Sequence, residues 1–160
     1  MLKQTRIMAL DPGGTTGWAT AIIENHTLES IESGQGKFTA LGLWTMFIAY
    51  APHYIVCETF RYRTQSREGL DLTSVKWIGI CELYAEQSGD ACQLKMQEPS
   101  EGKGFWHNNK LKQAGLYVPG KPHSMDALRH LLYFQTFKAG SQMWQRSSAY
   151  PFLTQFVQQQ

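Results

Sequence analysis

Long hydrophobic runs are absent from this sequence, and its net charge is small. No stretch reaches the roughly 18 uninterrupted apolar residues that a membrane-spanning helix needs. The first residues lead into a short apolar segment and lack the hydrophobic core of a signal peptide. These absences argue against a membrane protein and predict a cytoplasmic one. Lysine and arginine number 15 against 13 acidic residues, a formal net charge of +2, so total charge identifies no partner.

Cysteine is also scarce. The three cysteines, Cys57, Cys81 and Cys92, lie far apart, and none forms a Cys-x-x-Cys pair. An odd number of cysteines in apolar surroundings indicates reduced core thiols in a reducing compartment. The pattern therefore argues against a disulfide framework and against a zinc site.

The chain has neither an internal repeat nor a low-complexity domain. Its 160 residues are most economically one domain, and 42% apolar with 18% charged residues is typical of a globular protein. Near the end the composition changes, because serine and glutamine become frequent while aromatic residues persist. We therefore predict one domain over residues 1–139 and an extension, 140–160, that packs on the domain or on a partner subunit.

The sequence is organised around the stretch Arg6–Ala19. An apolar run, Ile7–Leu10, ends at Asp11 and meets Pro-Gly-Gly, and a second apolar run follows almost at once. This pattern predicts a β-hairpin with Asp11 at the end of its first strand. The alternative is an ordinary turn capped by an aspartate.

The remaining pattern predicts the order β-β-β-α-β-α-β-α-α. The expected elements are strands at Arg6–Leu10, Gly17–Glu24 and Leu28–Lys37, a helix capped by Thr39 and ended by Pro52, a strand at Tyr54–Glu58, a helix at Asp71–Ser88 capped by Asp71, a strand at Ala91–Met96, a flexible loop at Pro99–Gly104 carrying Lys103, a short helix at Phe105–Ala114 and a last helix from His123.

Carboxylates recur at the ends of these elements. Glu58 ends an apolar strand that is reached through a helix, which favours a parallel pairing with the first strand. Glu58 and Asp11 are then expected side by side at one sheet edge. His123 and Asp126 stand three residues apart, so both project from one face of the first turn of the last helix. The alternative for that pair is helix capping alone.

Basic residues cluster at Arg61–Arg67, Lys103–Lys112 and Lys121–Arg129. The segment Phe60–Gly69 is polar, basic and interleaved with aromatic residues, which is typical of a loop that binds nucleic acid. The alternative is a solvated loop with two aromatic side chains in the core. The candidate DNA-binding residues are Phe60 and Tyr62 for stacking, Arg61, Arg63 and Arg67 for phosphates, and Lys110 and Lys112 on the short helix.

Three motifs in this order resemble the RuvC-like Holliday junction resolvases of the RNase H-like superfamily. They are Asp11-Pro12-Gly13-x-x-x-Gly17-Trp18-Ala19, Val56-Cys57-Glu58-Thr59-Phe60 and His123-x-x-Asp126-Ala127. The match covers roughly residues 6–138. The resemblance implies an α/β fold with a mixed five-stranded sheet, three antiparallel strands followed by parallel strands, flanked by helices. Residues 1–139 would be the nuclease domain, and the compact form would suit a bacteriophage member.

The resemblance also implies a metal site. Asp11 would bridge two divalent cations, Glu58 would bind one of them, and Asp126 with His123 would complete the site. Some family members carry an acid where His123 stands, and the His-x-x-Asp version also occurs. Carboxylate oxygens are ligands that Mg²⁺ or Mn²⁺ prefers, and one imidazole favours Mn²⁺ somewhat. Lys103 would approach the phosphate.

The implied activity is metal-dependent, structure-specific cleavage of DNA. Symmetric hydrolysis of a four-way junction by two metal ions would leave 5′-phosphate and 3′-hydroxyl ends. Phe60 stands near where the family inserts an aromatic ring at the branch point. A two-fold symmetric substrate implies a homodimer, and the helix Asp71–Ser88 is the candidate interface.

Three other readings stay open from the sequence. An RNase H-like nuclease acting on flaps, forks or RNA–DNA hybrids would use the same acids. An actin-like ATPase or sugar-kinase fragment would share Asp-x-Gly-x-Thr-Thr-Gly, but the second domain and its phosphate loop are missing. A non-catalytic DNA-binding relative would keep the fold, yet all four site positions are filled here.

Overall fold

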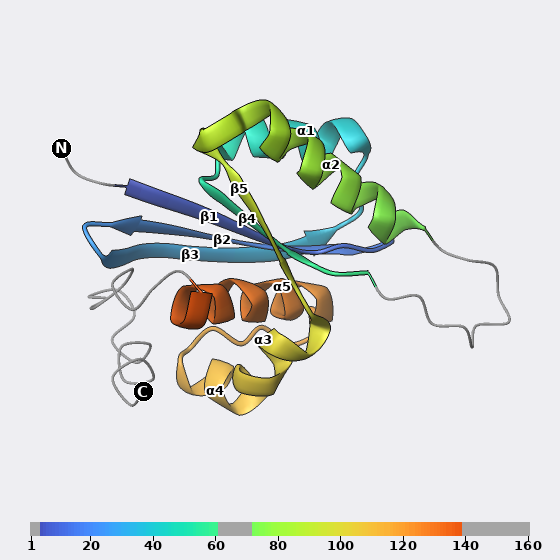
Figure 1. The fold of residues 1–160 in the computed structure, drawn as a ribbon. Coiled ribbons are helices and arrows are strands. Elements are labelled where there is room, and N and C mark those ends of the chain that lie inside the picture. Colours follow the sequence, from blue (N-terminus) through green and yellow to red (C-terminus); the bar gives the residue numbers. More distant parts are fainter. Residues whose placement is uncertain (1–3, 61–71, 139–160) are drawn as a thin grey trace, which may run out of the picture.

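A mixed five-stranded sheet separates two layers of helices (Figure 1). The computed structural model describes residues 4–60 and 72–138. The sheet order is β3-β2-β1-β4-β5, with β1 to β3 antiparallel and β4 and β5 parallel to β1. The strands are β1 Gln4–Asp11, β2 Thr16–Glu24, β3 Thr27–Gly36, β4 Tyr54–Glu58 and β5 Gln93–Gln97. The predicted mixed sheet, three antiparallel strands followed by parallel ones, is confirmed.

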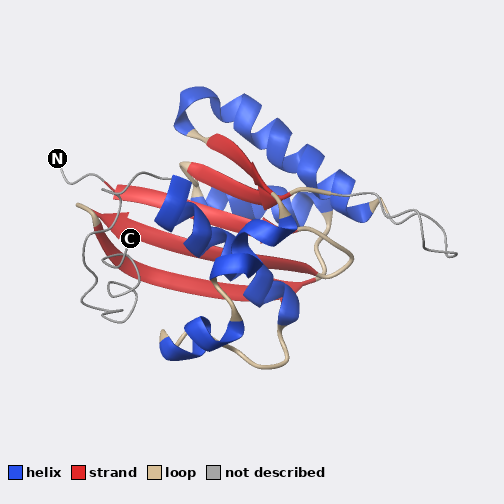
Figure 2. Ribbon diagram, turned by 60° about the horizontal axis from the view of Figure 1, so that its bottom comes forward, coloured by secondary structure: helices blue, strands red, loops and turns tan. Residues whose placement is uncertain are grey.

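Helices cover both faces of this sheet. Helices α1 (Ala40–Tyr50) and α2 (Thr73–Ser88) lie on one face, and α5 (Pro122–Tyr133) lies on the other. The short helices α3 (Pro99–Phe105) and α4 (Asn108–Gln113) lie on the α5 side (Figure 2). A 3-10 turn, η1 (Gly89–Ala91), precedes β5, and a π-helical turn, η2 (Phe134–Lys138), continues α5.

The central strand β1 contributes side chains to two separate cores, because its side chains alternate between the two faces of the sheet. Ile7 and Ala9 lie in the core shared with α5, whereas Met8 and Leu10 lie in the core shared with α1 and α2. Asp11 continues the odd-numbered series, so its carboxylate belongs to the α5 face. The alternation thus decides which helix can contact this acid.

Several predictions about individual elements are confirmed. Thr39 caps α1, since its Oγ1 accepts a hydrogen bond from the Gly42 N–H at 3.0 Å. All three cysteines are buried free thiols. Over residues 4–60 and 72–138, no helix combines the length and the apolarity needed to cross a bilayer.

The predicted loop at Pro99–Gly104 is wrong, because these residues form α3. Its two glycines and its proline are residues typical of loops, but proline is favourable in the first turn of a helix. Glu98 and Glu101 also form a capping box, in which the Glu98 N–H donates to the Glu101 carboxylate at 2.7 Å. The next helix is shorter than predicted. Asp71, the predicted cap of α2, lies outside the described residues.

Gly17 allows α5 to approach the sheet closely. A Cβ atom at this position would lie 1.9 Å from the carbonyl oxygen of His123 and 2.2 Å from its carbonyl carbon. Both of these are backbone atoms at the start of α5, so no side-chain rotation can relieve the clash. Gly17 pairs with Asp11 in the sheet, and this close contact therefore holds His123 near Asp11.

Replacing Gly17 tests this packing. We expect Gly17→Ala to lower the free energy of unfolding by about 1–3 kcal/mol or to prevent folding, because overpacking forces backbone shifts. Gly36→Ala is the matched control, since a Cβ there meets nothing within 4 Å. Urea unfolding monitored by circular dichroism gives both values. Equal stability of the Gly17→Ala and wild-type proteins would contradict the close approach of α5.

Candidate active site

Three carboxylates from three elements gather at one end of the sheet. Leu10 pairs with Cys57 across the parallel strands β1 and β4, so the next residues, Asp11 and Glu58, end these strands side by side. Asp126 reaches the same end from α5, and the negative charges of Glu58 and Asp126 both act on Asp11. The predicted juxtaposition of these acids is therefore present in the fold.

Asp11 is the most enclosed of the three acids, with 8% of its surface exposed. Burial raises its pKa above the ordinary value of 3.8, and the charges of Glu58 and Asp126 raise it further. His123 acts in the opposite direction, because its Nδ1 lies 2.8 Å from Asp11 Oδ2. Asp11 and His123 thus form one predicted pair of the site.

The turn behind Asp11 is anchored by α2. Ser74 Oγ donates a hydrogen bond to the Pro12 carbonyl at 2.7 Å, and Trp77 Nε1 donates to the Gly13 carbonyl at 3.0 Å. Thr16 Oγ1 also donates to the Gly13 carbonyl, at 2.9 Å. These contacts fix the backbone that leaves β1, and they therefore limit where the Asp11 carboxylate can lie.

Glu58 is held by a buried histidine that the sequence analysis did not identify. His130 Nε2 lies 2.7 Å from Glu58 Oε2, and His130 Nδ1 lies 2.7 Å from Gln97 Oε1. Gln97 pairs with Glu58 across the parallel strands β4 and β5. The three side chains therefore form a chain from β5 through α5 to β4.

Asp126 has two basic partners. Lys103 Nζ from α3 lies 2.9 Å from Asp126 Oδ2, and Arg129 contacts Asp126 Oδ1. Arg129 also donates from Nε to the Trp106 carbonyl at 2.9 Å and bonds the side chain of Asn108. The guanidinium thus ties α5 to the segment between α3 and α4.

Lys103 remains a strong base in this setting. Burial alone would lower the pKa of its ammonium group, but the hydrogen bond to Asp126 and the charges of the three acids outweigh burial and raise it. The position of Lys103 depends on the neighbouring Gly102, where a Cβ would lie 3.1 Å from Arg129 Cβ and from the His130 backbone nitrogen. This close packing of α3 on α5 brings Lys103 to Asp126.

The donor set fits a divalent cation. Within the part of the chain that the structure describes, no group of three histidine, cysteine or acidic side chains is close enough to hold one ion. Each acid instead contacts a basic side chain of the protein. Carboxylate oxygens with one imidazole suit Mg²⁺ or Mn²⁺. Burial, and after it the charges of Glu58 and Asp126, raise the pKa of Asp11, and a bound cation would favour its ionised form.

The predicted DNA-binding residues are only partly described. Phe60 is 36% exposed just beyond Glu58, whereas Arg61, Tyr62, Arg63 and Arg67 lie outside the described residues. On the other side of the acids, Lys110 Nζ lies 3.2 Å from the centre of the Phe105 ring, and Lys112 Nζ lies 5.1 Å from that of Tyr117.

Sequence reasoning missed His130, Gln97 and Arg129. The available signal was spacing, since His130 follows Asp126 by four residues and His123 by seven, which places all three on one side of a helix. Gln97 lies beside Glu58 in the parallel pairing of β4 and β5, but Gln93 and Lys95 on the same face of β5 are exposed, so alternation gave no sign that Gln97 is buried. Arg129 follows Asp126 by three residues, which is also the spacing of an ion pair along a helix.

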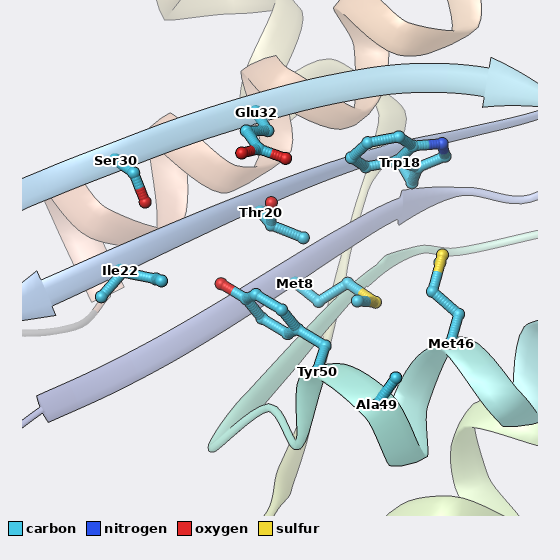
Figure 3. A pocket seen from close by; sticks show the side chains of 9 residues that line it. All are labelled: Met8, Trp18, Thr20, Ile22, Ser30, Glu32, Met46, Ala49 and Tyr50. Carbon is cyan, nitrogen blue, oxygen red and sulfur yellow. The ribbon is translucent and has the colours of Figure 1, made fainter.

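Two cavities differ in how close they lie to the three acids. A polar cavity of about 520 Å³ adjoins Lys103 and Arg129 and is also lined by His107, Asn108 and Asn109. A second cavity, of about 390 Å³, lies between α1 and the opposite face of the sheet (Figure 3). Its lining is largely apolar and includes Glu32 but none of the three acids. Of these two cavities, the polar one adjoins the candidate site, because Lys103 and Arg129 both contact Asp126.

The raised pKa of Asp11 predicts how stability depends on pH without metal. The folded protein binds the Asp11 proton at pH values where the unfolded chain releases it, so stability falls as pH rises from below about 4 through the higher folded pKa. Asp11→Asn removes this loss. In the presence of a chelator, we expect the variant to match the wild type at low pH and to exceed it near pH 7.

Urea midpoints of both proteins at several pH values measure this difference. Groups far from the site titrate alike in both proteins, so the comparison isolates Asp11 together with the groups that interact with it, His123, Glu58 and Asp126. A wild-type protein that gains stability over Asp11→Asn as the pH rises would contradict the raised pKa.

Comparisons with known proteins give structural matches alone. No protein-family model matches the chain, and no curated protein sequence matches it. Thermus thermophilus RuvC in complex with a Holliday junction substrate superposes with a TM-score of 0.61 and 17% identity, covering 84% of this chain and 94% of that chain.

Two further solved structures agree with this match. Thermus thermophilus RuvC on its own gives a TM-score of 0.56 and 16% identity, covering 84% of this chain and 95% of that chain. The yeast mitochondrial Holliday junction resolvase Ydc2 gives 0.50 and 14% identity, covering 97% of this chain and 84% of that chain. With its β3-β2-β1-β4-β5 sheet and flanking helices, the chain has the fold of the RuvC-like Holliday junction resolvases.

Proposed function

We propose that this protein is a metal-dependent endonuclease that resolves four-way DNA junctions by symmetric phosphodiester hydrolysis. One observation carries the proposal. Asp11, Glu58 and Asp126 meet at the ends of β1, β4 and α5 in a RuvC-like fold, and Lys103 contacts the last of them. A cluster of carboxylates with an adjacent ammonium suits a reaction that develops negative charge on phosphate oxygens.

The four residues Asp11, Glu58, His123 and Asp126 would hold two divalent cations, Mg²⁺ or Mn²⁺. When bound, such ions supply an activated water and neutralise charge on the scissile phosphate and the leaving oxygen. The charges of Glu58 and Asp126 both act on Asp11, which supports a bridging role for Asp11. The products are a 5′-phosphate and a 3′-hydroxyl.

Lys103 would contact the phosphate. Its ammonium group stays protonated beside the three acids, and almost half of its side chain is exposed. The polar cavity next to it, lined by His107, Asn108 and Asn109, offers donors for the neighbouring DNA backbone. Phe60 and the basic segment that follows it would contact the branch of the junction.

Charge-removing variants of the acids test the chemistry. We expect Asp11→Asn and Glu58→Gln to reduce junction cleavage in Mn²⁺ by about a thousandfold or more, since each removes several kcal/mol of charge stabilisation. Junction binding should stay intact or strengthen, because a negative charge facing DNA is lost. Gel assays with labelled junctions measure both properties.

Glu32→Gln is the matched control for this prediction. It makes the same change of charge in the cavity on the opposite face of the sheet, and cleavage should be unaffected. Duplex, flap, fork and RNA–DNA hybrid substrates complete the assay. If flaps or hybrids are cleaved as fast as junctions, the protein is a different RNase H-like nuclease and not a junction resolvase. If Asp11→Asn cleaves junctions at the wild-type rate, the proposed active site is wrong.

A two-fold symmetric junction calls for two active sites, so we propose a homodimer formed through α2. Val75, Gly79 and Leu83 repeat at four-residue spacing and lie on one exposed stripe of this helix. Val75 is 44% and Leu83 is 48% exposed. An apolar stripe on the outer side of a helix is a surface suited to a second copy.

Charges on this stripe should prevent dimerisation. We expect the double variant Val75→Glu, Leu83→Glu to sediment as a folded monomer, because the buried charges would be unpaired in the dimer. Leu41→Glu is the control, since it places the same charge on the exposed part of α1. Sedimentation velocity decides the question, and a wild-type protein that sediments as a monomer at micromolar concentration would refute the interface.

A further inference from the structure

We infer that His130 is a positioning residue that fixes the Glu58 carboxylate for metal binding, with Gln97 holding the imidazole in place. The inference rests on the proposed function, because it assigns a task to the surroundings of one proposed ligand. His130 belongs to none of the three motifs that resemble the RuvC-like family. Its role follows from the contacts within the interior of this chain.

The imidazole of His130 is fully enclosed and has both nitrogens engaged. The residue is 1% exposed. One ring nitrogen lies 2.7 Å from Glu58 Oε2 and the other 2.7 Å from Gln97 Oε1, so the ring cannot turn without breaking both contacts. Among the residues that the structure describes, Glu58 Oε1 makes no hydrogen bond. His130 thus binds one oxygen of the Glu58 carboxylate, and the other oxygen points away from the imidazole.

A histidine is a costly residue at this position. The neighbouring buried residues of α5, Leu128, Leu131 and Leu132, are apolar and pack in the core against the sheet. A polar ring buried among them loses its hydration, and this loss is offset only where its nitrogens find partners. An apolar side chain would satisfy packing alone, so the imidazole is accounted for by its contact with Glu58.

Gln97 adds a second, independent sign of the same arrangement. It is 2% exposed, and its Nε2 has no hydrogen-bond partner among the described residues. An unsatisfied buried amide nitrogen costs free energy. The amide group lies against His130 Nδ1, and turning it by 180° would let Nε2 donate to this nitrogen, so Gln97 can hydrogen-bond the ring in either orientation.

The basic partners of the three acids differ in their freedom to move. The side chains of His123 and Lys103 are 43% and 47% exposed, whereas that of His130 is 1% exposed. His123 has room to turn from Asp11 towards an approaching cation, and Lys103 has room to turn from Asp126 towards a phosphate. His130 has no such space, so Glu58 keeps its partner and its orientation.

Partners of this kind tune metal affinity. A group that hydrogen-bonds a ligating side chain fixes its orientation, and its loss typically weakens metal binding by about 10–100-fold. His130→Leu removes the donor and keeps a buried, apolar side chain of similar size. We expect this variant to bind Mn²⁺ about 10–100-fold more weakly than the wild type in the absence of DNA.

Electron paramagnetic resonance of free Mn²⁺ at fixed pH measures the dissociation constant directly. His130→Gln is the conservative variant, because its amide can still donate to Glu58, and it should restore most of the affinity. Leu132→Ala, on the same buried face of α5, is the control for destabilisation. It should lower the unfolding midpoint at least as much as His130→Leu yet leave Mn²⁺ affinity unchanged.

Gln97→Met keeps the result interpretable if His130→Leu does not fold. It removes the contact to His130 Nδ1 and should weaken Mn²⁺ binding in the same direction, by a smaller factor. Wild-type affinity in both His130→Leu and Gln97→Met, or an equal loss of affinity in Leu132→Ala, would overturn the inference.

Failure of the proposed function has a different signature. A wild-type protein that binds Mn²⁺ but cuts no branched DNA would refute the nuclease and leave the effect of His130 on affinity intact. A wild-type protein that cuts junctions while His130→Leu binds Mn²⁺ normally would refute the positioning role alone. A wild-type protein that binds no Mn²⁺ would overturn both.

Discussion

Repulsion among three carboxylates is the constraint on which the rest of the site depends. The acids come from β1, β4 and α5. Burial raises the pKa of Asp11, and the charges of Glu58 and Asp126 raise it further. The protein offsets their charge with a basic side chain against each one, drawn from α3 and α5. The packing of these two helices is therefore an electrostatic requirement as well as a source of buried apolar area, and the glycines at 17 and 102 permit it.

The sheet and the acids could be predicted because their signals are local. Each apolar run with a carboxylate at its end specifies a strand and the position of its last side chain, and the crossover through α1 specifies that β4 runs parallel to β1. The alternation of side chains then determines the face of the sheet. Ala9 and Val56 lie in the core on the α5 side, so Asp11 and Glu58, two residues further along each strand, point to the same side. The strand register and the alternation together therefore place both acids next to each other, at one end of the sheet and on the α5 face.

The partners of the acids could not be predicted in the same way, because they depend on contacts between distant elements. Lys103 was expected on a loop, since the glycines of Pro99–Gly104 outweighed the capping box that begins α3. His130 was indistinguishable from any polar residue of a helix until Gln97 and Glu58 were placed on neighbouring strands. Side-chain hydrogen bonds across elements follow from the packed fold and carry no periodic signal along the chain.

The fold and the proposed chemistry place opposite demands on these residues. Folding favours neutral groups in a buried pocket, whereas cation binding requires that the acids remain charged and that some of their partners be displaceable. The chain separates the two demands by exposure: Lys103 and His123 have room to turn away from their acids, while His130 and Arg129 stay enclosed. Changes that make the metal-free protein more stable by neutralising an acid would therefore remove function, so the site is a source of strain that the surrounding packing sustains.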